Sequence, residues 1–145
     1  MADSLLIAHN PDRSGALRIP SAQSIPTPRR SKNRAEILFI SGQFGIAPDG
    51  HLGADFAAQC EQAMDNVESL LAAADMNIAN LVKLTYYATR ATDFAELVQI
   101  RQRRWALVPA PSVTAIAVVA LARPEYLIEI EAVAVARRSR SHEQL

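Results

Sequence analysis

Residues 124–138 read PEYLIEIEAVAVARR, an alternating stretch that predicts a β-strand over residues 125–136. Successive side chains of a strand point to opposite faces of its sheet, so this stretch has two different faces. One face is uniformly small or branched and consists of Ile128, Ile130, Ala132, Ala134 and Ala136. The other face is mixed and consists of Leu127, Glu129, Glu131, Val133 and Val135. We expect the first face to pack beneath helices and the second to be free of them.

The preceding part of the chain supplies the helices and the other strands. We expect strands at residues 36–41, 81–89 and 112–121 and helices at residues 55–76 and 94–108. Asp55 opens the first helix, and Asp93 with Glu96 forms a capping box for the second. The element order is then β-α-β-α-β-β. This order contains two strand-helix-strand crossovers, which are almost always right-handed, so both helices fall on one face of a mixed sheet. The expected fold class is therefore an α+β two-layer sandwich.

Length and charge set the broad class of the protein. The 145 residues suit one domain, which we expect at residues 35–137, after an extended basic and proline-rich arm at 1–34 and before a flexible basic tail at 138–145. Fifteen basic residues balance fifteen acidic ones, which argues against a nucleic-acid partner. No signal peptide is apparent and no apolar run approaches the roughly 20 residues of a membrane span, so we expect no membrane partner and a cytoplasmic location.

The cysteine and the histidines do not form a reactive or metal-binding constellation. Cys60 falls on the expected buried face of the first helix, where a packing role is expected. His9, His51 and His142 lie in the two terminal segments and in a loop, and do not form a ligand cluster. We therefore expect no metal and no cofactor.

The sheet face without helices predicts an oligomer. The strand expected at residues 112–121 is also apolar on both faces. A sheet that is apolar on both sides but covered by helices on one should bury its second side against another surface, most simply another copy of the chain. We expect an obligate homo-oligomer.

Five blocks of the sequence resemble one protein family. They are ILFISGQ at 37–43, FAAQCEQAMDNVESLLAAADM at 56–76, VKLTYYATRATDF at 82–94, the turn at 109–112 and LIEIEAVAV at 127–135. Together they resemble the Rid family, also called the YjgF or endoribonuclease L-PSP-like proteins, over residues 35–137. The resemblance implies a chorismate-mutase-like fold that forms a homotrimer with clefts at the subunit interfaces.

The resemblance also implies a chemistry and its residues. Rid proteins of the deaminase type hydrolyse small imines and enamines to ammonia and a carbonyl product. The matching residues here are Glu129, which would direct the water, and Ser41 with Gly42, which would line the cleft. Tyr86 and Tyr87 point to opposite faces of their strand, and we expect Tyr87 to line the cleft as well.

The sequence departs from the family pattern at the turn Pro109-Ala110-Pro111-Ser112. In typical members an arginine at the position of Pro111 grips the substrate carboxylate, a task for which a planar guanidinium is suited. Proline offers neither a charge nor a backbone donor. The resemblance then implies a substrate other than a simple 2-imino acid, bound near Pro111 and Ser112. The candidates to replace the missing arginine are Arg29, Arg30, Arg101 and Arg123, and we expect Arg123 from its position.

The two glutamates of the last strand have two possible roles. Residues two apart on a strand lie roughly 7 Å apart on one face, so the two carboxylates can share work across a substrate or can be interface residues. We expect a catalytic role for Glu129 and a structural one for Glu131.

For the protein as a whole, the leading function is a Rid-like hydrolase of a small-molecule substrate. The alternatives are a trimer that binds a metabolite without turnover, and a ribonuclease or translation inhibitor.

Overall fold

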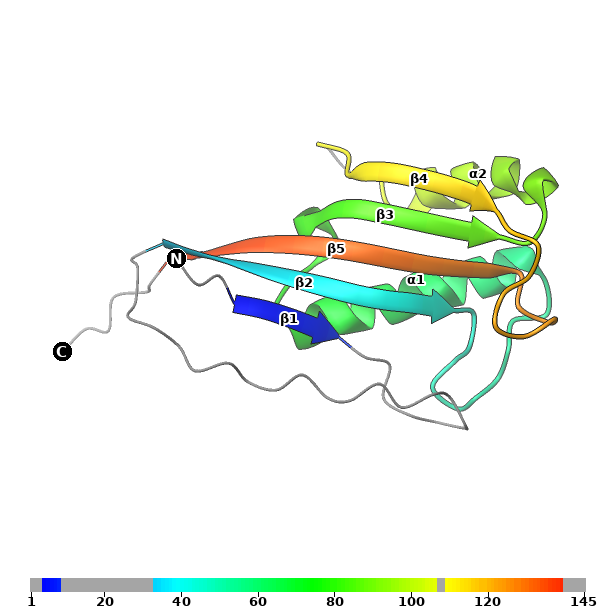
Figure 1. The fold of residues 1–145 in the computed structure, drawn as a ribbon, viewed down its shortest axis with the longest axis horizontal. Helices are drawn as coiled ribbons and strands as arrows, with labels where there is room; N and C mark the ends of the chain where they lie inside the picture. Colours follow the sequence, from blue (N-terminus) through cyan, green and yellow to red (C-terminus); the bar gives the residue numbers. More distant parts are fainter. Residues whose placement is uncertain (1–3, 9–32, 107–108, 140–145) are drawn as a thin grey trace.

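A computed structural model describes residues 4–8, 33–106 and 109–139 as a five-stranded mixed sheet with two helices on one face (Figure 1). The strand order is β1-β2-β5-β3-β4. The strands are β1 (Ser4–Ala8), β2 (Asn33–Phe44), β3 (Leu81–Ala88), β4 (Ser112–Ala117) and β5 (Ile128–Ser139). β5 is antiparallel to β2 and β3, whereas the edge strands β1 and β4 run parallel to their neighbours. The expected α+β two-layer sandwich is confirmed.

Both helices lie behind the sheet in the view of Figure 1. They are α1 (Phe56–Ala73) and α2 (Phe94–Arg104), and single 3-10 turns at Ile78–Asn80 and Ala91–Asp93 precede β3 and α2. α1 packs on β2 and β5 at the centre of the sheet. Within the described part of the chain, no helix is long and apolar enough to cross a lipid bilayer.

The two faces of β5 are assigned as the alternation predicted. Ile128, Ile130, Ala132 and Ala134 are buried in the core beneath the helices. α1 meets them with a stripe of residues at spacings of three and four: Phe56, Cys60, Ala63, Met64, Val67 and Leu71. Glu129 and Glu131 therefore lie on the face without helices, which we call the open face.

The N-terminal segment contains a strand that the sequence did not predict. β1 pairs in parallel with β2, from Ser4 opposite Glu36 to Ala8 opposite Ile40. The short apolar run SLLIA has no turn signals or long alternation of its own, and only the edge of β2 gives it a partner. Of the expected arm, residues 1–3 and 9–32 lie outside the described residues, as do residues 140–145 of the expected tail, whereas residues 33–34 and 138–139 belong to β2 and β5.

Several strand ends differ from the expected ones because the partner strands fix them. β4 ends at Ala117 and not at residue 121, because its partner strand β3 ends at Ala88. The last hydrogen bond between the two strands runs from Val118 N–H to the carbonyl oxygen of Ala88 (2.9 Å). β5 begins at Ile128 and runs on to Ser139, where it pairs with the start of β2 at Asn33.

One helix cap is confirmed and the other is wrong. The Asp55 carboxylate accepts a hydrogen bond from Ala58 N–H at 2.8 Å, as a helix N-cap does. The Asp93 carboxylate makes no capping hydrogen bond to the first turn of α2. It accepts a hydrogen bond from Arg90 Nε at 2.8 Å instead. A 3-10 turn carries the chain into α2, so Asp93 has helical backbone angles and its side chain is turned away from the N-terminal amides.

Candidate functional site

The open face brings Glu129 together with residues from β2 and β3. In the sheet register Glu129 stands between Phe44 on β2 and Tyr87 on β3. Glu131 stands opposite Thr85 on β3. The two glutamates are half-buried and, being two residues apart on β5, lie roughly 7 Å apart along the strand. The expected pair of carboxylates on one face is therefore present.

Gly42 provides the space in which the Glu129 carboxylate lies. The β2–β5 register shifts between Ile40 and Gln43, so Ser41 and Gly42 form a bulge in β2. A Cβ placed on Gly42 would come within 1.6 Å of Glu129 Oε1. Only a residue without a side chain allows the carboxylate to lie against the backbone there. Ser41, the neighbouring site candidate, is exposed in the same bulge.

Tyr87 contributes its hydroxyl to the same face. The Tyr87 hydroxyl donates a hydrogen bond to Glu131 Oε2 at 3.0 Å. Tyr86 points the other way and is fully buried in the core. The predicted division of these two tyrosines is confirmed, and the open face gains a proton-bearing group close to both carboxylates.

The electrostatic setting distinguishes Glu129 from an ordinary surface carboxylate. Burial first, and then the negative charge of Glu131, raise the pKa of the Glu129 carboxyl above its usual range. A raised pKa brings a carboxyl closer to neutral pH, where it can both take up and return a proton. This is the property required of a group that activates water.

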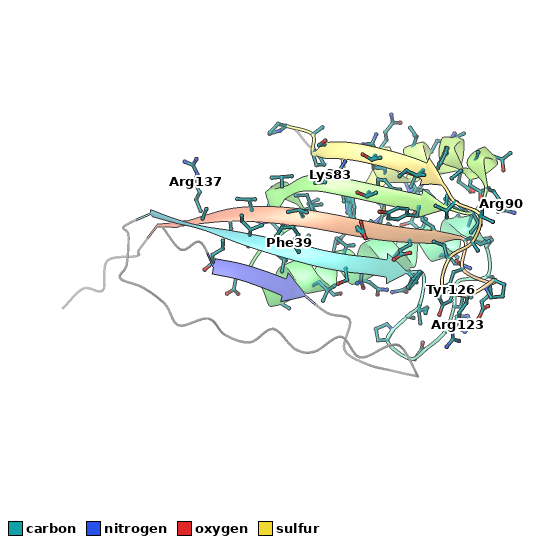
Figure 2. All side chains as sticks on the ribbon, viewed as in Figure 1. Phe39, Lys83, Arg90, Arg123, Tyr126 and Arg137 are labelled. Atoms are coloured by element: carbon teal, nitrogen blue, oxygen red, sulfur yellow. The ribbon has the colours of Figure 1, made fainter. Side chains whose placement is uncertain are left out.

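An aromatic pair with an arginine lies beside Glu129. The rings of Phe44 and Tyr126 have their centroids 4.5 Å apart, and the Arg123 guanidinium carbon lies 6.0 Å from the centroid of Tyr126. Figure 2 shows Arg123 and Tyr126 together at the end of the sheet where β2 ends. The guanidinium also lies 3.9 Å from a carboxylate oxygen of Glu125, and its side chain is half exposed.

Gln59 of α1 holds the two loops that frame this region. Its amide nitrogen donates to the carbonyls of Gly53 (3.1 Å) and Glu125 (3.0 Å), and its amide oxygen accepts from Leu127 N–H (2.8 Å). The side chain is buried. Gln59 thus ties the loop after β2 to the chain segment that enters β5 two residues before Glu129.

Pro111 and Ser112 lie away from Glu129 in the single chain. Ser112 is opposite Lys83 at the start of β3, four positions before Tyr87, which corresponds to roughly 13 Å along the strand. Pro111 lines a shallow cavity of about 170 Å³ with Leu84, Arg101, Gln102, Trp105, Ala106 and Ala110. The structure therefore groups Glu129 with Gly42 and Tyr87, places Arg123 beyond them against Tyr126, and separates Pro111 and Ser112 from Glu129.

Cys60 has the packing role that its position predicted. It is fully buried in the core, and this burial, with a smaller contribution from Glu61, raises the pKa of the thiol to about 12. A thiol that stays protonated is a poor nucleophile. Cys60 is therefore no candidate for covalent chemistry.

Three residues that frame the site were not predicted as part of it: Phe44, Gln59 and Tyr126. The strand at 36–41 was expected to stop at Gly42, which left Phe44 in a loop. The signal for Phe44 was present, because a glycine inside an apolar run also indicates a bulge through which a strand continues. Gln59 carries a weaker signal, a long polar side chain on the apolar side of a helix.

Comparison with known proteins identifies the family. The family model described as Endoribonuclease L-PSP matches residues 29–136. The chain belongs to this family. The family indicated by the sequence motifs is thereby confirmed.

Individual members of the family are similar over most of their length. A RutC family protein of Pasteurella multocida is 35% identical over 102 residues, which cover 68% of this chain and 79% of the relative. The 2-iminobutanoate/2-iminopropanoate deaminase of Escherichia coli is 34% identical over 106 residues, 70% of this chain and 80% of that enzyme. The crystal structure of E. coli TdcF with bound serine superposes with a TM-score of 0.64 at 28% identity, covering 69% of this chain and 80% of TdcF.

Proposed function

We propose that this protein hydrolyses a small imine or enamine to ammonia and a carbonyl compound, with Glu129 directing the water. The observation that carries the proposal is the Glu129 carboxylate, half-buried against Gly42 and raised in pKa by burial and by Glu131. Membership in a family that includes proteins named imine deaminases supports the reaction class.

The reaction requires one group that takes and returns protons. An enamine first gains a proton on its β-carbon and becomes the protonated imine, whose C=N carbon is electrophilic. Glu129 takes a proton from water as the water oxygen bonds to that carbon and the C=N electron pair moves to nitrogen. Glu129 returns the proton to nitrogen. The C–N bond then breaks as the C=O bond forms, and the hydroxyl proton leaves with the nitrogen as ammonium.

We propose that the complete site is formed between subunits of a homotrimer. Within one chain Ser112 lies roughly 13 Å along the sheet from Glu129, too far for both to contact one small substrate. The open face also carries an apolar group that consists of Ile37, Phe39, Val133 and Val135. Packing of this group against a second copy would bury it and bring Ser112 of one chain toward Glu129 of another.

Phe39→Glu should convert the trimer to monomers, because it places a charge in the proposed interface. Phe39 is 44% exposed in the single chain. Sedimentation velocity measures the assembly state directly. Val98→Glu is the matched control, since Val98 is 41% exposed on α2, on the other side of the sheet, and this variant should remain trimeric. A wild-type protein that sediments as a monomer would contradict the interface.

We propose that Arg123 binds a carboxylate of the substrate in place of the arginine that Pro111 replaces. Its guanidinium is held over Tyr126 and is only loosely paired with Glu125. Loss of one charge-assisted hydrogen bond costs about 1.5–3 kcal/mol, so Arg123→Gln should lower kcat/KM by about tenfold or more for an imine that carries a carboxylate. The loss should appear mainly in KM.

The measurement is ammonia release from two groups of imines generated in situ. Imines made by an amino-acid oxidase carry a carboxylate, and imines made by an amine oxidase do not. Arg123→Gln should affect only the first group. Arg103→Gln, which removes an exposed arginine on α2, is the control and should affect neither. Equal losses on both groups would refute an anchoring role. Thermal stabilisation by imine analogues without any ammonia release would favour the binding protein over the enzyme.

A further inference from the structure

The hydrogen bond between Tyr87 and Glu131 makes the two carboxylates of the open face unequal. Tyr87 is the register partner of Glu129 on β5. Its hydroxyl nevertheless donates its hydrogen bond to Glu131 Oε2, 3.0 Å away. A phenol is protonated at neutral pH and donates this bond, so it stabilises the ionised form of the carboxylate that accepts it. Within the described residues, Glu129 receives no corresponding side-chain donor.

The other groups that face the pair do not offset this asymmetry. β3 also contributes Lys83, whose ammonium donates to the hydroxyl of Thr114 on β4. β2 contributes Gly42 and Phe44, which do not titrate. The helices lie on the opposite face of the sheet (Figure 1). In the described part of the chain, Tyr87 is therefore the donor that distinguishes one carboxylate from the other.

We propose that Tyr87 is a positioning residue of this site: its hydroxyl keeps Glu131 ionised, so that the proton taken up by the two carboxylates resides on Glu129. The catalytic meaning of this inference rests on the proposed function. Two glutamates roughly 7 Å apart along one strand of a half-buried face influence each other's ionisation, and the first proton goes to the carboxylate whose charge is less stabilised by its surroundings. That carboxylate is the one of Glu129, which is the residue placed over Gly42.

The electrostatics of the site agree with this order. Burial and then the charge of Glu131 raise the pKa of Glu129, and donation to Glu131 raises the pKa of Tyr87. A tyrosine with a raised pKa keeps its hydroxyl proton and remains a hydrogen-bond donor while the carboxylates titrate.

Carbon-detected NMR titration of the glutamate side-chain carboxyls tests the inference without any substrate. Glu129→Gln and Glu131→Gln variants assign the two signals. In the wild type, the Glu129 signal should titrate at the higher pH of the two. In Tyr87→Phe, which keeps the ring and removes the hydroxyl, the two titration steps should lie closer together because Glu131 has lost the donor that stabilises its charge.

Tyr126→Phe is the control, because it removes a hydroxyl from a nearby aromatic ring and should leave the order of titration unchanged. An unchanged separation between the two titration steps in Tyr87→Phe would overturn the inference. With an imine substrate, Tyr87→Phe should also change the pH profile of kcat/KM, whereas a purely structural tyrosine would lower the rate equally at every pH. If the NMR result is as expected but no imine is hydrolysed, the pairing is supported and the proposed function is refuted, so the two failures are distinguishable.

Discussion

Glu129→Gln should lower the rate of imine hydrolysis by about 10²- to 10⁴-fold, the usual range for loss of a positioned general acid–base group. Glutamine has nearly the shape of glutamate and fits the same space against Gly42. It cannot accept a proton from water, so the attacking oxygen is no longer activated. Ammonia release under single-turnover conditions measures the chemical step. Glu96→Gln, which neutralises an exposed carboxylate of α2, is the control and should retain full activity.

The same substitution should not destabilise the fold. Burial and Glu131 raise the pKa of Glu129 in the folded chain, so the folded state binds this proton more tightly than the unfolded state does. The stabilisation from this group is therefore present at low pH and is lost as the pH rises from the unfolded pKa through the folded one. Glutamine does not ionise, and the free energy of unfolding at pH 7 should be equal to or above that of the wild type in urea denaturation. A combined loss of stability and activity would indicate a structural role.

The alternation in β5 was sufficient to predict the face on which the catalytic candidate lies. Period-two patterning depends only on local backbone geometry, which is why the buried set from Ile128 to Ala134 and the open-face glutamates were assigned correctly. The helix α1 was predicted for the same reason, since its apolar stripe and its Asp55 cap are local signals. Properties that lie within one element were accessible from the sequence.

Properties that depend on contacts between distant segments were not accessible. The contact of Gly42 with Glu129 requires both the bulge in β2 and the β2–β5 register, and the two residues are far apart in the chain. The hydrogen bonds of Gln59 to Glu125 and Leu127 likewise join α1 to a loop that follows two more strands. Asp93 was expected to cap α2 but pairs with Arg90 instead. This pairing depends on the 3-10 turn at Ala91–Asp93, which the helix propensities of these residues alone do not specify.

Gly42→Ala should reduce turnover by about 10²-fold although glycine supplies no side-chain group to the reaction. The added Cβ would lie 1.6 Å from Glu129 Oε1, 2.5 Å from its Cδ and 2.8 Å from its Cγ, so the side chain must adopt another rotamer. Displacement of a catalytic group by about 1 Å is sufficient for a loss of this size. The three nearest atoms all belong to the flexible side chain of Glu129, so the melting temperature should change little. Ammonia release and thermal denaturation of the same preparation measure the two effects.

A double-mutant cycle separates this explanation from general damage to β2. If Gly42 acts by leaving room for the Glu129 carboxylate, the two substitutions remove the same contribution and their effects cannot add. In the Glu129→Gln background, Gly42→Ala should therefore cost less than about threefold in rate, where the same change costs about 10²-fold in the wild type. A full further loss in that background would show that Gly42 affects the site by a route that does not involve Glu129.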